Sequence, residues 1–330
     1  MFKTRITELF GIKYPIIAGA MAQLSLAELV AAVSNAGGLG SLASVTFSTG
    51  HELKEEIRKT KNLTDKPFAV NFPIIPPGMM PEVEAVSISP EKVLEIIIEE
   101  EVRVVETLIF TPEPYMERFK QAGVKVFHKT PSLRHALSAE KAGVDAIAML
   151  GIEGGGHPGE DEVGALVRIP ATVDALKIPV IAAGGIVDAR GFVAAMALGA
   201  EGVLMGTRFV NTHESAIHSK IREWMLQAKD TDTCLIEKSS RIPERVLMNK
   251  TVMELLELEK QGVTRAEKMH LLSQENVIRG WREGDTEGAA LSSGQGVGLI
   301  HETITVKEVI DNMINGATSI LERLGYLIRT

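Results

Sequence analysis

Short apolar runs alternate with amphipathic segments along residues 1–209 of the chain. The apolar runs lack a regular alternation of apolar and polar residues, which is typical of parallel strands buried on both faces. Segments between them, such as LAELVAAVSNAG, carry apolar residues three and four positions apart, as a helix with one buried face does. We therefore predict eight strands, at residues 15–21, 39–44, 68–74, 102–109, 124–130, 145–151, 179–185 and 202–209.

Glycine stands at the junctions between predicted helices and strands. In NAGGLGSLAS, QAGVKVFHKT, KAGVDAIAML and LGAEGVLMGT, an apolar run directly follows an Ala-Gly or Gly-Ala pair. Glycine just beyond a helix accepts the left-handed backbone conformation that ends the helix. Eight β–α units in strict alternation predict an α/β fold, a closed TIM (β/α)8 barrel. A doubly wound open sheet is the alternative.

The pattern changes after Phe209. Residues 210–304 are polar and helix-rich, without paired strand runs, and residues 306–325 have the periodicity of one long amphipathic helix. We therefore predict a barrel made of residues 1–209 and 305–330. Residues 210–304 would form a mainly helical subdomain, inserted after strand eight and covering the active-site end. A free-standing C-terminal domain is the alternative.

Composition narrows the classes of partner. The chain has 330 residues, 45% of them hydrophobic and 24% charged, with a net charge of −8. This acidic balance argues against nucleic acid as a partner, because phosphate backbones are bound by clustered Lys and Arg. No apolar run approaches the roughly 18 residues of a membrane helix, and the start has no signal-peptide pattern. The single cysteine, Cys234, excludes a disulfide within the chain and predicts a cytoplasmic location.

Glycine stands at the ends of predicted strands seven and eight, as the pair Gly184–Gly185 in AAGGI and as Gly206 in MGTRF. Backbone N–H groups at the start of a helix attract anions, and the loops after these two strands are the usual phosphate site of such barrels. We therefore predict that Gly184, Gly185, Gly206 and Thr207 bind a phosphate; the alternative is that they only form tight turns. GLGSLA, residues 38–43, fits a dinucleotide motif, but here the helix precedes the strand, the reverse of what that motif requires.

The stretch GIEGGGHPGEDE places His157 after three glycines at the end of predicted strand six. Without Cβ atoms, residues 154–156 could let the backbone approach a flat ligand, and histidine suits proton transfer near neutral pH. The alternative is a loop histidine bonded to its acidic neighbours. No second histidine stands at a ligand spacing, so we predict no metal site.

Polar residues also stand in or at the end of other predicted strands. Asn71 lies within the apolar run FAVNFPI and must find partners, either on a ligand or on neighbouring strands. Lys129 closes predicted strand five, where it could pair with a phosphate or an electron-rich ring, or reach to the surface. Ala20 and Met21 stand at the end of strand one.

These motifs in order resemble the FMN-dependent nitronate monooxygenases, formerly called 2-nitropropane dioxygenases, over nearly the whole chain. PIIAGAM, PFAVNFPI, KVFHKT, EGGGHPGE, IPVIAAGGIVDARG, GVLMGTRF and SSGQGVGLI carry the resemblance. The resemblance implies noncovalent FMN, with its phosphate at Gly184, Gly185, Gly206 and Thr207. It places the ring and ribityl chain near Met21, Asn71 and Lys129, and makes His157 the catalytic residue. The full set of expected cofactor-binding residues is Ala20, Met21, Asn71, Lys129, Gly155, Gly156, Gly184, Gly185, Met205, Gly206, Thr207 and Gln295.

The resemblance implies oxidation of alkyl nitronates with O2. GHPGED also resembles a branch with NAD(P)H:quinone reductases, in which NADH or NADPH reduces the flavin, and IAAGGI with GTRFV resembles flavin-dependent enoyl-ACP reductases. A non-catalytic barrel that binds a phosphorylated ligand is the alternative from another class. We expect small-molecule substrates, a nitronate, nitroalkane or quinone, and consider a homo-oligomer.

Overall fold

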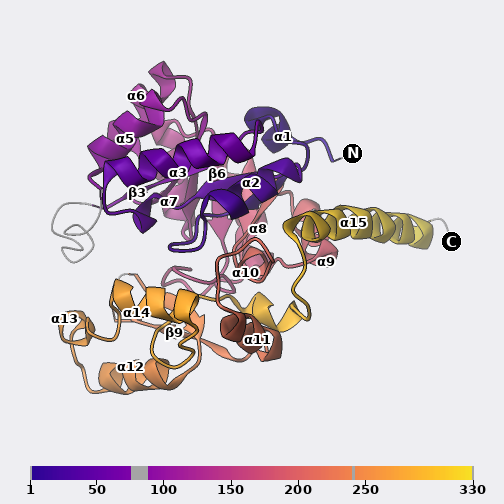
Figure 1. The fold of residues 1–330 in the computed structure, drawn as a ribbon. Coiled ribbons are helices and arrows are strands. Elements are labelled where there is room, and N and C mark those ends of the chain that lie inside the picture. Colours follow the sequence, from indigo (N-terminus) through magenta and orange to yellow (C-terminus); the bar gives the residue numbers. More distant parts are fainter. Residues whose placement is uncertain (1, 76–87, 240–241, 329–330) are drawn as a thin grey trace.

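The computed structural model describes residues 2–75, 88–239 and 242–328 and contains a closed barrel of eight parallel strands (Figure 1). Each strand pairs with the next in sequence, and β1 pairs with β8. The predicted barrel is therefore confirmed over the open sheet. The strands are β1 Ile16–Ala18, β2 Leu39–Leu42, β3 Ala69–Ile74, β4 Val104–Ile109, β5 Lys125–Thr130, β6 Ala146–Leu150, β7 Val180–Ala183 and β8 Gly202–Met205.

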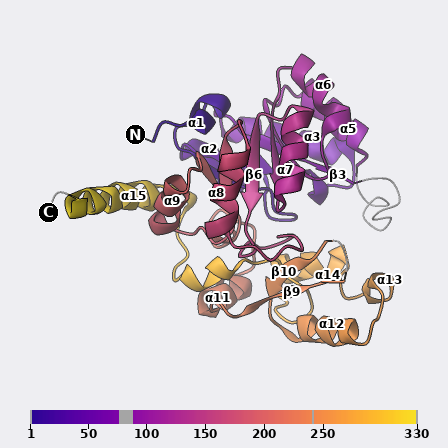
Figure 2. The ribbon, with the colours of Figure 1, turned by 180° about the vertical axis from the view of Figure 1, so that it is seen from behind.

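Helices surround the barrel and return the chain from the end of one strand to the start of the next, as Figures 1 and 2 show. The helices between consecutive strands are α2 Ala27–Asn35, α3 Gly50–Leu63, α5 Pro90–Glu99, α6 Glu113–Gln121, α7 Leu133–Ala142, α8 Ala165–Ala175 and α9 Ala189–Ala197. The long helix α15, Val306–Ile328, packs against α9 and α2 and so takes the place of the helix that follows β8. No helix among the described residues is both long and apolar enough to cross a membrane.

The apolar residues of the strands form two layers. One layer fills the barrel interior, where Phe10 from the N-terminal helix α1, Arg5–Phe10, packs on Phe127 at a ring distance of 5.6 Å. The other layer lies between the strands and the surrounding helices. Alternate residues of each strand enter the two layers, so both faces are buried, and this explains the uninterrupted apolar runs in the sequence.

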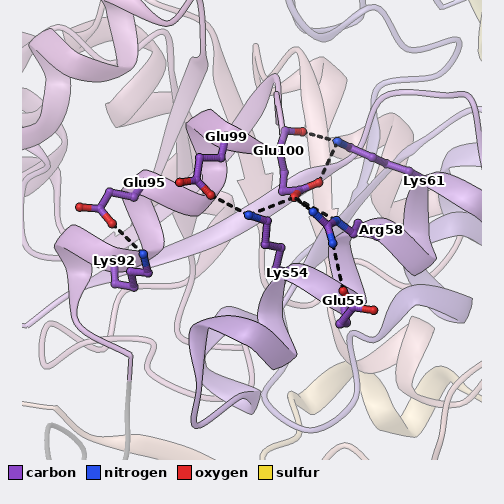
Figure 3. A network of polar contacts seen from close by, with 8 residues as sticks. All are labelled: Lys54, Glu55, Arg58, Lys61, Lys92, Glu95, Glu99 and Glu100. Atoms are coloured by element: carbon purple, nitrogen blue, oxygen red, sulfur yellow. Dashed lines mark hydrogen bonds and ion pairs between the residues drawn. The ribbon is translucent and has the colours of Figure 1, made fainter.

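A network of charged side chains joins the outer faces of α3 and α5 (Figure 3). Glu100, at the C-terminal end of α5, is 7% exposed, and its carboxylate lies 3.0 Å from the Arg58 guanidinium. Lys54 and Lys61 approach the same carboxylate at 3.7 and 3.4 Å. One buried acid thus anchors three cations of the neighbouring helix.

Residues 210–304, which follow β8, contain more than the helices that we expected there. They contain an antiparallel hairpin of β9, Thr233–Ile236, and β10, Glu244–Leu247, so the expectation of no paired strands was wrong. These strands are only four residues long, too short to show a clear periodicity. The other elements of the segment are α10 Thr207–Val210, α11 Ser219–Gln227, α12 Lys250–Lys260, α13 Arg265–Lys268, α14 Gln274–Ile278, a π-helical turn Arg279–Glu283 and a 3-10 turn Gln295–Leu299. Figures 1 and 2 show most of these as a layer beneath the barrel.

Candidate functional site

A layer of polar side chains lies next to the apolar filling of the barrel, toward the C-terminal ends of the strands. Asn71 on β3, Glu106 on β4 and Lys129 on β5 form this layer. Residues two positions apart on a strand share a face, and each of the three follows an interior apolar residue by two positions. Those interior residues are Ala69, Val104 and Phe127. The polar layer therefore faces the end of the barrel where active sites of this fold form.

Glu106 makes the contacts that organise this layer. Its side chain is fully buried, and its Oε1 lies 3.0 Å from Nζ of Lys129, whose side chain is 19% exposed. Its Oε2 accepts a hydrogen bond of 2.9 Å from the backbone N–H of Ala20, and its carbonyl oxygen accepts one of 3.4 Å from Asn71 Nδ2. Glu106 was not among the predicted site residues, although a lone acid inside the apolar run VRVVETLI was a usable signal.

Two buried hydroxyls near this end of the barrel retain unused hydrogen-bonding capacity. Ser41 on β2 follows the interior residue Leu39 by two positions, and Ser293 belongs to the loop before the last 3-10 turn. Neither Oγ has a hydrogen-bond partner among the residues that the structure describes. Because buried polar groups normally find partners, these atoms are consistent with a polar ligand at this end of the barrel.

The ends of β7 and β8, with Gly184–Gly185 and Gly206–Thr207, lie side by side because the two strands pair with each other. Gly184 and Gly185 have φ angles of +93° and +72°, a conformation that favours glycine. Gly206 immediately precedes α10, and the Thr207 hydroxyl accepts a hydrogen bond of 3.0 Å from the N–H of Gly294. The structure thus brings the four predicted phosphate residues together.

The glycines before His157 are used differently from the expectation. A Cβ on Gly155 would lie 2.7 Å from the backbone of Ser293 and Gly294, so the missing side chain admits another loop of the protein. A Cβ on Gly154 would lie 2.4 Å from Leu150 Cδ1. Only Gly156, with a φ of +73°, has no described heavy atom within 4 Å of an added Cβ.

The hairpin of β9 and β10 holds the loop that carries His157. Gly156 and Arg245 exchange backbone hydrogen bonds of 2.7 and 3.2 Å, and Arg245 Nε donates to the carbonyl of Ile152 at 2.9 Å. The His157 side chain is exposed, and its Nδ1 lies 3.3 Å from the carbonyl oxygen of Pro243. A carbonyl oxygen only accepts, so this contact places the hydrogen on Nδ1 and leaves Nε2 as an acceptor.

The acids that follow His157 have other partners. Asp161 pairs with Arg168 at 3.0 Å, and Glu162 pairs with Lys238 at 2.7 Å. Asp161 and Glu162 therefore do not hold the His157 imidazole, contrary to the alternative interpretation of this loop. The imidazole is oriented by the backbone of the hairpin instead.

Residues 3–316 match the family model described as nitronate monooxygenase. The chain belongs to the nitronate monooxygenase family. It is 34% identical to (3aS,4S,5R,7aS)-5-hydroxy-7a-methyl-1-oxo-octahydro-1H-indene-4-carboxyl-CoA dehydrogenase of Rhodococcus jostii (strain RHA1), over 98% of both chains. It is 32% identical to a probable nitronate monooxygenase of Staphylococcus saprophyticus, over 97% of this chain and 99% of that one.

Solved structures of similar proteins agree with the family assignment. FabK from Thermotoga maritima superposes with a TM-score of 0.89 at 36% identity, over 99% of this chain and all of that one. A nitroalkane oxidase from Streptomyces ansochromogenes superposes with a TM-score of 0.82 at 25% identity, over 97% and 99% of the two chains. This nitronate monooxygenase family member is therefore a flavin-dependent oxidoreductase, and the non-catalytic alternative is set aside.

The remaining predicted residues of this family member differ in what they present to the site. Met21 is partly buried, and its Sδ lies 3.6 Å from the position of a Cβ on Gly206. The Gln295 N–H donates to the carbonyl of Glu153 at 2.9 Å. This bond joins the loop of residues 293–295, which we call the late loop, to the loop after β6. The Met205 side chain packs between the strands and the helices, so only its backbone reaches this end of the barrel.

His128 lies next to Lys129 but faces the opposite side of the strand. It is buried between the barrel and its helices, with Nδ1 2.9 Å from the hydroxyl of Thr107. Burial, and to a smaller degree the charges of His135 and Lys129, lowers the pKa of His128 to about 4. This imidazole stays neutral near pH 7 and takes no part in the polar layer.

Proposed function

We propose that the chain is an FMN-dependent oxidoreductase of the nitronate monooxygenase type that oxidises alkyl nitronates with O2. One observation carries the proposal: a polar layer with unused buried hydroxyls lies at the barrel end where Gly184–Gly185 and Gly206–Thr207 follow adjacent strands. The orphaned Ser41 hydroxyl and the partly exposed Lys129 ammonium both suit a ligand that combines a polar ring edge with a hydroxylated chain.

The residues present fit FMN. Backbone N–H groups of Gly184, Gly185 and Gly206 would hold the phosphate, because backbone N–H groups at strand ends and helix starts attract anions. Asn71 and Lys129 would face the ring and the ribityl chain. Bound FMN supplies the electron transfer, while the protein binds and orients the substrate and moves its proton.

His157 would act on the substrate. With hydrogen on Nδ1, its Nε2 can accept the α-proton of a neutral nitroalkane, so that the C–H electron pair stays on the substrate and a nitronate forms. In its protonated form, Nε2–H can donate a hydrogen bond to a nitronate oxygen. Removing one general base typically costs 10²–10⁴-fold in rate. We expect His157→Ala to lose turnover on this scale while its flavin absorbance is retained; full turnover with nitroalkanes and nitronates would contradict the role.

A second candidate is a redox reaction on an acyl thioester, such as flavin-dependent enoyl reduction. The similarity to a carboxyl-CoA dehydrogenase and to FabK, at 34% and 36% identity, favours this candidate. The GHPGED motif adds quinone reduction by NADH or NADPH as a further reaction.

Anaerobic mixing separates these reactions. If the flavin absorbance bleaches with propyl nitronate but not with NADH or NADPH, the nitronate proposal is supported. If NADH or NADPH bleaches it rapidly, the nitronate proposal is wrong. Turnover with a quinone against turnover with an enoyl thioester then decides between the two reductase candidates.

We also propose that residues 210–304 form a subdomain over the substrate side of the site, with the barrel made of residues 1–209 and 305–330. The backbone contacts of Arg245 with Gly156 and of Gly294 with Thr207 support this division, because they join the segment to loops after β6 and β8. A cytoplasmic location and a homo-oligomer stay predictions.

A further inference from the structure

We infer that Glu106 is a positioning residue for the flavin site, which fixes the Lys129 ammonium and the Ala20 backbone relative to the ring. The inference rests on the proposed FMN site. Glu106 is fully buried, and a buried carboxylate is stable only when it is paired and hydrogen-bonded. Its Oε1 is paired with the Lys129 ammonium of β5, and its Oε2 accepts a hydrogen bond from the loop after β1.

Lysine alone would not hold its charge at a fixed place. Its four-carbon stem is flexible, and its strongly hydrated ammonium moves toward water when nothing restrains it. The Lys129 side chain is 19% exposed, so it has access to solvent at this end of the barrel. The ion pair of 3.0 Å with Glu106 draws the ammonium down onto the polar layer instead.

The same carboxylate sets the position of the loop after β1. The N–H of Ala20 donates to Glu106 Oε2 at 2.9 Å, and Met21 follows directly. One acid therefore controls both a charge and a stretch of backbone beside the predicted ring position.

The ion pair of Glu106 and Lys129 is electrically neutral as a unit, so the two single substitutions change the local charge in opposite directions. Removal of Glu106 leaves a net positive charge, and removal of Lys129 leaves a net negative charge. Reduction adds two electrons to the flavin, and a nearby positive charge favours the more negative, reduced form. The two single substitutions should therefore shift the midpoint potential of the flavin in opposite directions.

The experiment measures this potential in wild type, Glu106→Gln, Lys129→Met and the double variant, each reconstituted with FMN and titrated with dithionite. We expect Glu106→Gln to shift the potential upward, Lys129→Met to shift it downward, and the double variant to return close to wild type. Glu100→Gln is the matched control, because it also removes a buried, cation-bound acid but lies on the outer helices. It should lower the melting temperature and leave the flavin potential unchanged.

Melting temperatures of the flavin-free proteins provide the second readout. Both single variants should melt below wild type, and the double variant should melt higher than the sum of the two losses predicts, since no buried charge is left alone. If Glu106→Gln does not fold, the melting temperatures of Lys129→Met and of the double variant still test the pairing. The double variant should be at least as stable as Lys129→Met.

Two results would overturn the inference. One is a potential that moves in the same direction in both single variants, or stays unchanged in Glu106→Gln while only its melting temperature falls. The other is strictly additive melting losses in the flavin-free proteins. A wild-type protein that binds no FMN would instead refute the proposed function, and the flavin-free measurements would still test the pairing.

Discussion

Substitution of Gly155 by alanine tests why glycine stands before the histidine. An added Cβ would lie 2.7 Å from both Gly294 N and Ser293 C, and ordinary van der Waals contact begins near 3.4 Å. All of these atoms belong to the backbone, so no side-chain rotation relieves the clash. The late loop must therefore move away from the loop after β6 by several tenths of an ångström.

The magnitude follows from the contacts that such a movement weakens. The Gln295 N–H donates to Glu153 at 2.9 Å, and the Gly294 N–H donates to the Thr207 hydroxyl at 3.0 Å. A net contribution of about 1 kcal/mol per hydrogen bond, together with overpacking strain, gives a loss of about 2–4 kcal/mol in the free energy of unfolding. For a chain of this length we expect a fall of roughly 3–6 °C in melting temperature.

The assay is thermal unfolding of the flavin-free protein, followed by titration with FMN. Gly156→Ala is the matched control, because it lies in the same loop and its Cβ meets no described heavy atom within 4 Å. Its φ of +73° makes the substitution cost about 1–2 kcal/mol through backbone strain alone. Gly155→Ala should be the more destabilising of the two.

One result would refute this reasoning. If flavin-free Gly155→Ala melts like wild type but no longer binds FMN, then the glycine serves the approach of the ligand, as the sequence indicated. Loss of stability without flavin is the outcome that only contact between the two loops produces.

Three further predictions concern the hairpin, the buried histidine and the outer helices. Arg245→Met removes the donors to Ile152 and to the Thr233 hydroxyl, so we expect a loss of about 2–3 kcal/mol and faster proteolysis of the loop after β6. Because the pKa of His128 is lowered to about 4, its contribution to stability is present above about pH 6.5 and is lost as the pH falls from 6.5 toward 4. Between pH 7 and pH 4.5 the melting temperature should therefore fall less in His128→Asn than in wild type. The corresponding difference in the loss of unfolding free energy is up to about 3 kcal/mol. Glu100→Gln leaves three cations without their shared partner and should lower stability by about 2–4 kcal/mol, measured by urea unfolding.

The barrel could be predicted from the sequence because its pattern is local. Each strand buries both faces, which produces uninterrupted apolar runs, and a glycine follows the ends of α2, α6, α7 and α9 within two residues. The observed strands lie within the predicted ranges and are shorter. Predicted strand eight, for example, included residues 206–209, but the strand ends at Met205, Gly206 caps α10, and residues 207–209 belong to that helix. There the chain leaves the barrel toward the insertion.

The hairpin could not be predicted, because its pairing depends on residues distant in the sequence. Arg245 lies opposite Leu235 in the register of β9, exchanges backbone hydrogen bonds with Gly156, and accepts one at its carbonyl from the N–H of Ser293. An arginine in a strand of four residues gives no apolar pattern. In the same way the sequence indicates that residue 155 must lack a Cβ, but only the fold shows which backbone takes the space.

The residues of the polar layer could be predicted from the sequence only in part. Asn71 and Lys129 were predicted from their place in apolar strands, whereas Glu106 and Ser41 were not among the predicted residues. A single acid inside a buried strand must have a cation and donors nearby, because a lone buried carboxylate is too costly. That rule, applied to VRVVETLI, would have identified Glu106 and pointed to the lysine of the adjacent strand.

Two parts of the chain therefore control two different aspects of the proposed chemistry. The barrel alone supplies the charges of Glu106 and Lys129, which in this proposal would act on the flavin, whereas the hairpin orients His157, which would act on the substrate. A change in the hairpin can then alter the substrate reaction while the cofactor site stays intact. Such a separation would allow similar chains to carry the names of a nitronate monooxygenase and a carboxyl-CoA dehydrogenase. It also implies that substitutions in β10 should change turnover without moving the flavin potential, whereas substitutions in β4 should move both.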